Sequence, residues 1–70
     1  NLDVYAVTTG RIFAVEIESG VTDLYLRPDA NSVYSGLEFV YYHVNQVLPF
    51  GLGEEVIGGS RIASQLLHTR

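Results

Sequence analysis

Three tyrosines in the middle of the sequence are the side chains with the clearest capacity to bind a ligand. Tyr34, Tyr41 and Tyr42 could together form an aromatic surface for a sugar or a peptide, since a tyrosine offers an apolar ring with a polar hydroxyl. The alternative interpretation is cross-strand packing, which is the commoner role of tyrosines that alternate along strands. We predict Tyr34, Tyr41 and Tyr42 as binding residues and keep packing as the alternative.

The two histidines, His43 and His68, are the strongest metal ligands in a chain that has no cysteine. A catalytic zinc site needs three protein ligands, and no carboxylate is placed by its spacing beside either histidine. We therefore expect no catalytic zinc and no other cofactor in the chain as given. The plain interpretation of His43 is a strand residue at the rim of a sheet, hydrogen-bonded to backbone or water. His68 is expected to be solvated.

Other features that look like chemical sites lack an essential part. Glu54 and Glu55 are adjacent in a turn, so their carboxylates point apart and cannot face each other across a substrate as those of a glycosidase do. The glycines around them have the spacing of a phosphate-binding loop, but a glycine stands where its lysine must be. The chain contains no lysine, which excludes a lipoyl or biotinyl attachment site and a Schiff base.

The length and composition of the chain are those of one small acidic domain. Its 70 residues hold four arginines against eight carboxylates, which gives a net charge of −4. Four dispersed arginines cannot follow a phosphate backbone, so we expect no nucleic-acid partner. The apolar runs are too short to span a bilayer, so we expect no membrane insertion. A chain that is 47% hydrophobic and has no disulfide must bury apolar surface in a dense core or against a partner, and we expect a homo-oligomer.

Short strands separated by turns are the elements that must position these side chains. Gly10 is expected to make a turn with a positive φ, and Ser19-Gly20 to separate two strands. Alternation along the central strand predicts that Tyr41 and His43 share one face and that Val44 lies on the other. The pattern predicts an all-β fold, a small barrel or sandwich of six or seven strands. The expected strands cover 4–8, 11–18, 21–27, 37–44, 47–50 and 61–67, with 54–57 as a further short segment and a helix as the alternative for 63–67.

Two segments carry motifs that occur together in one known family. The first is Val4-Tyr5-Ala6 followed by Gly10 and Ile12, which is similar to the pattern V-Y-A-x-x-x-G-x-V. The second is Tyr41-x-His43, similar to Y-x-H-L, followed by a hairpin similar to V-x-x-G-x-x-V-x-x-G-x-x-I-G. Val44 ends the strand that carries the first of these motifs, and the hairpin matches at Val47, Gly53, Val56, Gly59, Ile62 and Ala63. Over residues 4–63 the chain thus resembles the lysostaphin-type zinc endopeptidases, whose fold is a barrel-sandwich hybrid.

The resemblance implies a peptidase-like domain in which His43 takes the place of a histidine that assists catalysis beside the metal. The family holds zinc with a His-x-x-x-Asp motif before its first strand and with a His-x-His pair near its end. These motifs would lie before residue 1 and after residue 70, so zinc would bind only if a longer parent chain supplied them. We expect a single β domain over 1–70, a fragment of a larger domain and extracytoplasmic, that is non-catalytic as given.

Two hypotheses of function follow. In the first, the peptidase-like domain binds cell-wall peptide or a protein partner in a groove beside Tyr41 and His43. In the second, the chain is a small β interaction module that works as an oligomer. The second rests on Val40, Tyr42 and Val44, which are expected to form an apolar face that the domain's own core leaves uncovered.

Overall fold

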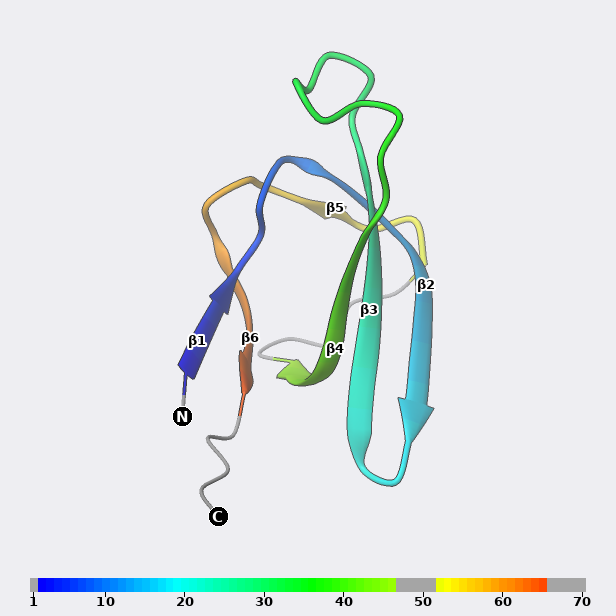
Figure 1. The fold of residues 1–70 in the computed structure, drawn as a ribbon, viewed down its shortest axis with the longest axis vertical. Coiled ribbons are helices and arrows are strands. Elements are labelled where there is room, and N and C mark those ends of the chain that lie inside the picture. Colours follow the sequence, from blue (N-terminus) through cyan, green and yellow to red (C-terminus); the bar gives the residue numbers. More distant parts are fainter. Residues whose placement is uncertain (1, 47–51, 66–70) are drawn as a thin grey trace.

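The computed structural model describes residues 2–46 and 52–65, and every regular element within these ranges is a β-strand (Figure 1). The predicted all-β fold of six or seven short strands is therefore confirmed, with six strands. None of the described residues belongs to a helix long and apolar enough to cross a membrane. The strands are β1 (Leu2–Tyr5), β2 (Gly10–Glu18), β3 (Val21–Pro28), β4 (Phe39–Gln46), β5 (Glu55–Val56) and β6 (Arg61–Gln65).

All six strands pair antiparallel in one sheet, in the order β1-β6-β4-β3-β2-β5. The sheet curls into a half-barrel, with β5 crossing the upper end in Figure 1. Three register shifts interrupt the pairing, at Val4/Tyr5 in β1, at Ile12/Ala14 in β2 and at Thr22/Leu24 between β3 and β4. Such bulges bend a strand and increase its twist, which lets so small a sheet close around its own core.

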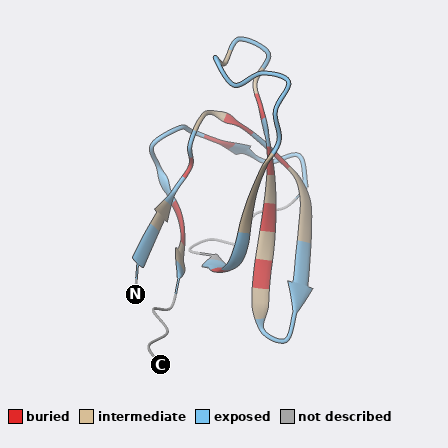
Figure 2. Cartoon of the chain, viewed as in Figure 1, coloured by how far each residue is buried: buried red, intermediate tan, exposed pale blue. Residues whose placement is uncertain are grey.

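The core lies inside the curl, and alternate residues of the central strand β3 contribute to it. Thr22, Leu24 and Leu26 of β3 are buried, and the residues between them face outward (Figure 2). This is the alternation predicted for 21–27. Within the described part of the chain, the buried apolar residues form one cluster, which consists of Ala6, Ile12, Leu24, Leu26, Val44, Val56, Ile62 and Ala63.

The turn between β2 and β3 sets the register of the hairpin that carries most of the outer face. Ser19 and Gly20 both have positive φ, 52° and 81°. A two-residue turn with both φ values positive is type I′, whose twist matches that of the flanking strands. It pairs Glu18 with Val21. The predicted break at Ser19-Gly20 is thus confirmed.

The conformation of Gly10 differs from the prediction of a turn. It has no positive φ and makes no turn, but begins β2 opposite Pro28. A β-carbon at this position would lie 2.3 Å from the carbonyl oxygen of Arg27, so the missing side chain permits a close approach of two backbones.

The ends of the predicted strands also differ. β1 begins earlier than expected, at Leu2, and ends at Tyr5. β6 is a strand through Gln65, so the helical alternative is wrong for residues 63–65. The expected strand 47–50 lies outside the described residues.

Candidate functional site

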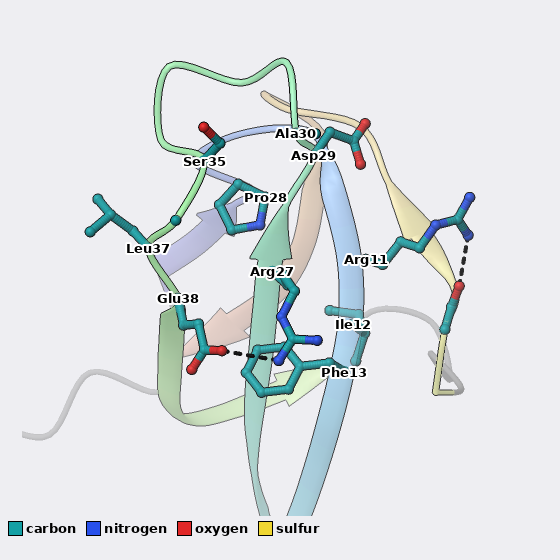
Figure 3. Close-up of a pocket in the computed structure, with 12 residues that line it drawn as sticks. Arg11, Ile12, Phe13, Arg27, Pro28, Asp29, Ala30, Ser35, Leu37 and Glu38 are labelled. Carbon is teal, nitrogen blue, oxygen red and sulfur yellow. Dashed lines mark hydrogen bonds and ion pairs between the residues drawn. The ribbon is translucent and has the colours of Figure 1, made fainter.

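A pocket of about 790 Å³ opens on the outer face, where β2 begins and β3 ends, beneath the loop over residues 29–38 (Figure 3). Its lining includes two arginines, two carboxylates and several apolar side chains, and we call it the arginine pocket. The charged residues are Arg11, Arg27, Asp29 and Glu38, and the larger apolar residues are Ile12, Phe13, Pro28 and Leu37. The floor is largely apolar, and the charged groups stand at its sides.

The two arginines occupy paired positions on neighbouring strands, Arg11 in β2 opposite Arg27 in β3. Their side chains extend in different directions in Figure 3, since that of Arg27 lies over Phe13 beside Glu38 and that of Arg11 does not. Like charges at paired positions repel. Each side chain is held by a separate acceptor: Arg11 Nη1 donates to the carbonyl oxygen of Gly53 at 2.9 Å, and Arg27 Nη2 donates to Glu38 Oε2 at 3.0 Å. The fold thus concentrates half of the chain's positive side chains at one pocket.

Phe13 fixes the position of one guanidinium. The Cζ atom of Arg27 lies 4.3 Å from the centre of the Phe13 ring, a cation–π contact. Phe13 is the extra residue of the bulge in β2, between Ile12 and Ala14. The same ring packs edge-on against Tyr25, with centroids 5.9 Å apart. The bulge therefore aims an aromatic ring under the arginine.

The ion pair between Arg27 and Glu38 is weak enough to be exchanged. Both side chains are more than half exposed, at 61% and 54%, and exposed ion pairs contribute only about 0–1 kcal/mol. The planar guanidinium matches the two oxygens of a carboxylate. A ligand carboxylate could replace that of Glu38 at little cost, with an apolar neighbour resting on Phe13 and Leu37.

The predicted binding tyrosines lie in three different environments. Tyr41 packs against the core, and its hydroxyl oxygen accepts a hydrogen bond from the Val7 N–H at 2.9 Å. Burial raises the pKa of Tyr41, and the Val7 hydrogen bond partly opposes this. Tyr34 packs edge-on against Phe39 with centroids 5.5 Å apart, and Tyr42 is 60% exposed. None of the three lines the arginine pocket.

His43 occupies a bulge opposite Asp23. Its φ is +54°, and its backbone N–H donates to Asp23 Oδ1 at 2.8 Å. The bulge overturns the predicted faces of β4, because Val44 is buried in the core against which Tyr41 packs, while His43 is exposed. The prediction of an apolar outer face that includes Val44 is therefore wrong.

The surroundings of His43 are acidic. It lines a second hollow of about 320 Å³, near the tip of the β2–β3 hairpin, together with Glu16, Glu18 and Asp23. The ring of Tyr42 packs edge-on against the imidazole, with centroids 6.3 Å apart. Tyr41 does not line this hollow, so the expected groove beside both Tyr41 and His43 is not found there. The catalytic role of His43 stays a prediction.

Replacing His43 with glycine is expected to leave the free energy of unfolding within about 1 kcal/mol of the parent, because glycine adopts a positive φ without a β-carbon clash. His43→Val should lower it by about 1–2 kcal/mol, since a branched side chain is strained in this region. Urea unfolding followed by circular dichroism measures both. A glycine variant less stable than the valine variant would contradict the positive φ at this position.

Tyr25 and Glu16 form a polar pair on the outer face that the sequence did not reveal. The Tyr25 hydroxyl donates a hydrogen bond to Glu16 Oε1. That hydrogen bond, together with partial desolvation and the carboxylate charge, raises the pKa of Tyr25 from 10.0 to about 12. Alternation places Tyr25 on the outer face, but the pairing with Glu16 requires the register of the hairpin.

The pair predicts a dependence of stability on alkaline pH. Because the folded-state pKa of Tyr25 lies above its ordinary value of 10.0, the pair stabilises the fold fully below pH 10 and is lost as the pH rises towards 12. In an ultraviolet titration, Glu16→Gln should return the Tyr25 pKa towards its ordinary value, and Glu18→Gln should leave it unchanged. Equal titration curves for the parent and Glu16→Gln would contradict the pairing.

Among residues 2–46 and 52–65, no three histidine or carboxylate side chains lie close enough together to hold a metal ion. His68 lies outside the described residues. The arginine pocket is therefore the strongest candidate site on chemical grounds. Comparisons of the chain with models of protein families, with curated proteins and with solved structures find no match.

Proposed function

We propose that this domain is a non-catalytic binding module that holds a peptide carboxylate in the arginine pocket. The observation that carries the proposal is the exposed guanidinium of Arg27, which lies over the Phe13 ring and pairs with the exposed carboxylate of Glu38 in a pocket that Arg11 also lines. The planar guanidinium of Arg27 can bind both oxygens of a carboxylate, and the apolar side chains of the pocket supply a contact beside it.

Glu38 acts as an internal substitute for the ligand. Its carboxylate already occupies one guanidinium fork, at 3.0 Å from Arg27 Nη2. An incoming carboxylate must displace it, and the exposure of both partners makes that exchange inexpensive. Removing the charge of Glu38 should therefore strengthen binding, while removing the charge of Arg27 should weaken it.

The resemblance to lysostaphin-type peptidases, which stays a prediction, supports a cell-wall peptide as the first ligand class to test and an extracytoplasmic location. A protein tail that ends in a free carboxylate has the same chemistry. We place the peptide in the arginine pocket and not beside Tyr41 and His43, because the Tyr41 hydroxyl is bonded to Val7 and the bulge directs His43 to an acidic hollow.

Calorimetric titration with a short peptide that ends in an apolar residue and a free carboxylate tests the proposal. Arg27→Gln should weaken binding about tenfold or more, as expected for a charged hydrogen bond, and Glu38→Gln should strengthen it several-fold. Arg61→Gln is the matched control, since that arginine pairs with Asp3 on β1. The same peptide with an amidated end should not bind. Equal binding of the amidated peptide, or equal losses for the two arginine variants, would refute the proposal.

A further inference from the structure

We infer that the peptide held in the arginine pocket pairs as an added strand with the free edge of β2, antiparallel to it. This mode of binding rests on the proposed function, because the same peptide carboxylate occupies the arginine pocket. It adds the conformation of the ligand, its direction along β2 and the chemistry of the residues that precede its carboxylate. In such recognition, main-chain hydrogen bonds give affinity and alternate side chains give specificity.

The edge of β2 that faces away from β3 has two parts. β5 and the residues just before it pair with 10–12. Pairing stops there, at Gly53, which lies in a turn and has a φ of +81°. Among the described residues, nothing pairs with this side of β2 over 13–18, and we call these residues the free stretch. Figure 1 shows no labelled strand to the right of the lower half of β2. An unpaired row of N–H and C=O groups is a template for another strand.

The hairpin turn determines which backbone groups of the free stretch point outward. A two-residue turn closes on a hydrogen-bonded pair, here Glu18 with Val21, and such pairs alternate along the ladder. The N–H and C=O groups of Val15 and Ile17 are therefore directed away from β3. Ile17 is also 71% exposed although it lies opposite the buried Thr22, on the side of the sheet that carries the core. A strand added here would satisfy these groups and cover Ile17.

The charges at the two ends of the free stretch determine the direction of the peptide. The stretch begins at Phe13, whose ring lies under the guanidinium of Arg27 in the pocket that Arg11 also lines. It ends with Glu16 and Glu18, alternate residues that share the outer face of the sheet. An antiparallel peptide brings its terminal carboxylate to the arginines. A parallel peptide would bring it to the glutamates, where like charges repel.

The same register determines the side chains that suit the ligand. Peptide residues opposite Val15 and Ile17 lie on the core side of the sheet, so they should be apolar. Those opposite Glu16 and Glu18 lie on the outer face and should be basic, since opposite charges at paired positions stabilise a sheet. The ligand is therefore an extended peptide in which basic and apolar residues alternate before a free carboxylate.

Calorimetric titration with a series of N-methylated peptides tests the pairing. The unmethylated peptide is long enough to cover the free stretch, alternates basic and apolar residues and ends in a free carboxylate. A methyl group on a nitrogen that faces β2 removes a hydrogen bond and clashes with the strand, whereas a methyl group on the next nitrogen faces away. Methylation at successive positions should therefore weaken binding about tenfold or more at every second residue and less than about threefold between them.

Two variants of β2 test the same contacts from the side of the protein. Ile17→Pro removes an N–H that β3 does not use, so it should keep the strand content of the parent in circular dichroism and weaken binding about tenfold. Ile17→Thr, which keeps the N–H, is its matched control and should bind within about threefold of the parent. Glu18→Lys should weaken binding a few-fold, and a peptide with glutamate at the facing position should restore it.

Amidation of the peptide separates the failure of this pairing from the failure of the proposed function. If methylation has equal effects at successive positions, or none, while amidation still abolishes binding, the pairing is refuted and the arginine pocket stands. If the peptide with a free carboxylate does not bind, both are refuted. A parent chain that dimerises in sedimentation equilibrium, and becomes monomeric with Ile17→Pro, would show that a second copy covers this edge and would also overturn the pairing with a peptide.

Discussion

Replacing Gly10 with alanine is expected to lower the free energy of unfolding by more than about 3 kcal/mol, at the upper end of what overpacking costs. The new β-carbon would lie 2.3 Å from the Arg27 carbonyl oxygen, and 2.9 Å from both the Arg27 carbonyl carbon and the Pro28 Cα. All three are backbone atoms, so no side-chain rotation relieves the contact. β2 and β3 would have to separate where the arginine pocket is built.

A loss of this size is a large part of the stability of a 70-residue domain, which at ordinary values per residue is about 4–10 kcal/mol. Chemical unfolding followed by circular dichroism measures it. The matched control is Gly59→Ala, where φ is +84° and the space is open, so only the backbone preference of about 1 kcal/mol is lost. Equal losses for Gly10→Ala and Gly59→Ala would contradict the close approach of β2 and β3.

Truncating Leu24 to alanine is expected to lower the free energy of unfolding by about 2–5 kcal/mol, the range for a buried leucine. Leu24 lies in the middle of β3, the strand between β2 and β4, and its side chain has no exposed surface. The cavity would open between the two halves of the sheet, where few neighbours can move in to fill it.

Leu52→Ala is the control for this core prediction, because Leu52 is 72% exposed and its truncation should change stability by less than about 0.5 kcal/mol. Urea unfolding midpoints of both variants and the parent give the comparison. If Leu24→Ala lost no more stability than Leu52→Ala, the assignment of β3 as the core strand would be wrong.

Local sequence pattern predicted the strands because alternation and turn residues act over short distances. The alternation of 21–27 identified Leu24 and Leu26 as one face, and both are buried. Ser19-Gly20 marked the hairpin turn for the same reason, since positive φ is a property of the turn residues themselves.

The bulges could not be predicted in this way, and they decide the candidate site. A regular hairpin closing at Glu18 and Val21 would set Arg11 opposite Pro28; the extra residue at Phe13 shifts Arg11 opposite Arg27. At His43, the bulge depends on a hydrogen bond to Asp23, 20 residues earlier in the chain. Both bulges depend on contacts between strands, and the periodicity of residues along one strand gives no information about such contacts.

The role of Gly10 was misjudged for a related reason. A glycine after two threonines is typical of a turn. The residues next to Gly10 in the sequence do not indicate that the Arg27 carbonyl group approaches it from another strand. The Tyr41 hydroxyl likewise has a partner that its local sequence does not indicate, the backbone N–H of Val7. The binding role of the three tyrosines stays a prediction.

The most direct test of the central claim is a nitrogen–proton NMR titration that follows the arginine side-chain signals while a carboxylate-ending peptide is added. The arginine pocket predicts saturable shifts of the Arg11 and Arg27 side-chain signals, no shift of Arg61, and no response to the amidated peptide. Shifts confined to His43 and Tyr42, or equal shifts of Arg27 and Arg61, would contradict peptide binding in the arginine pocket.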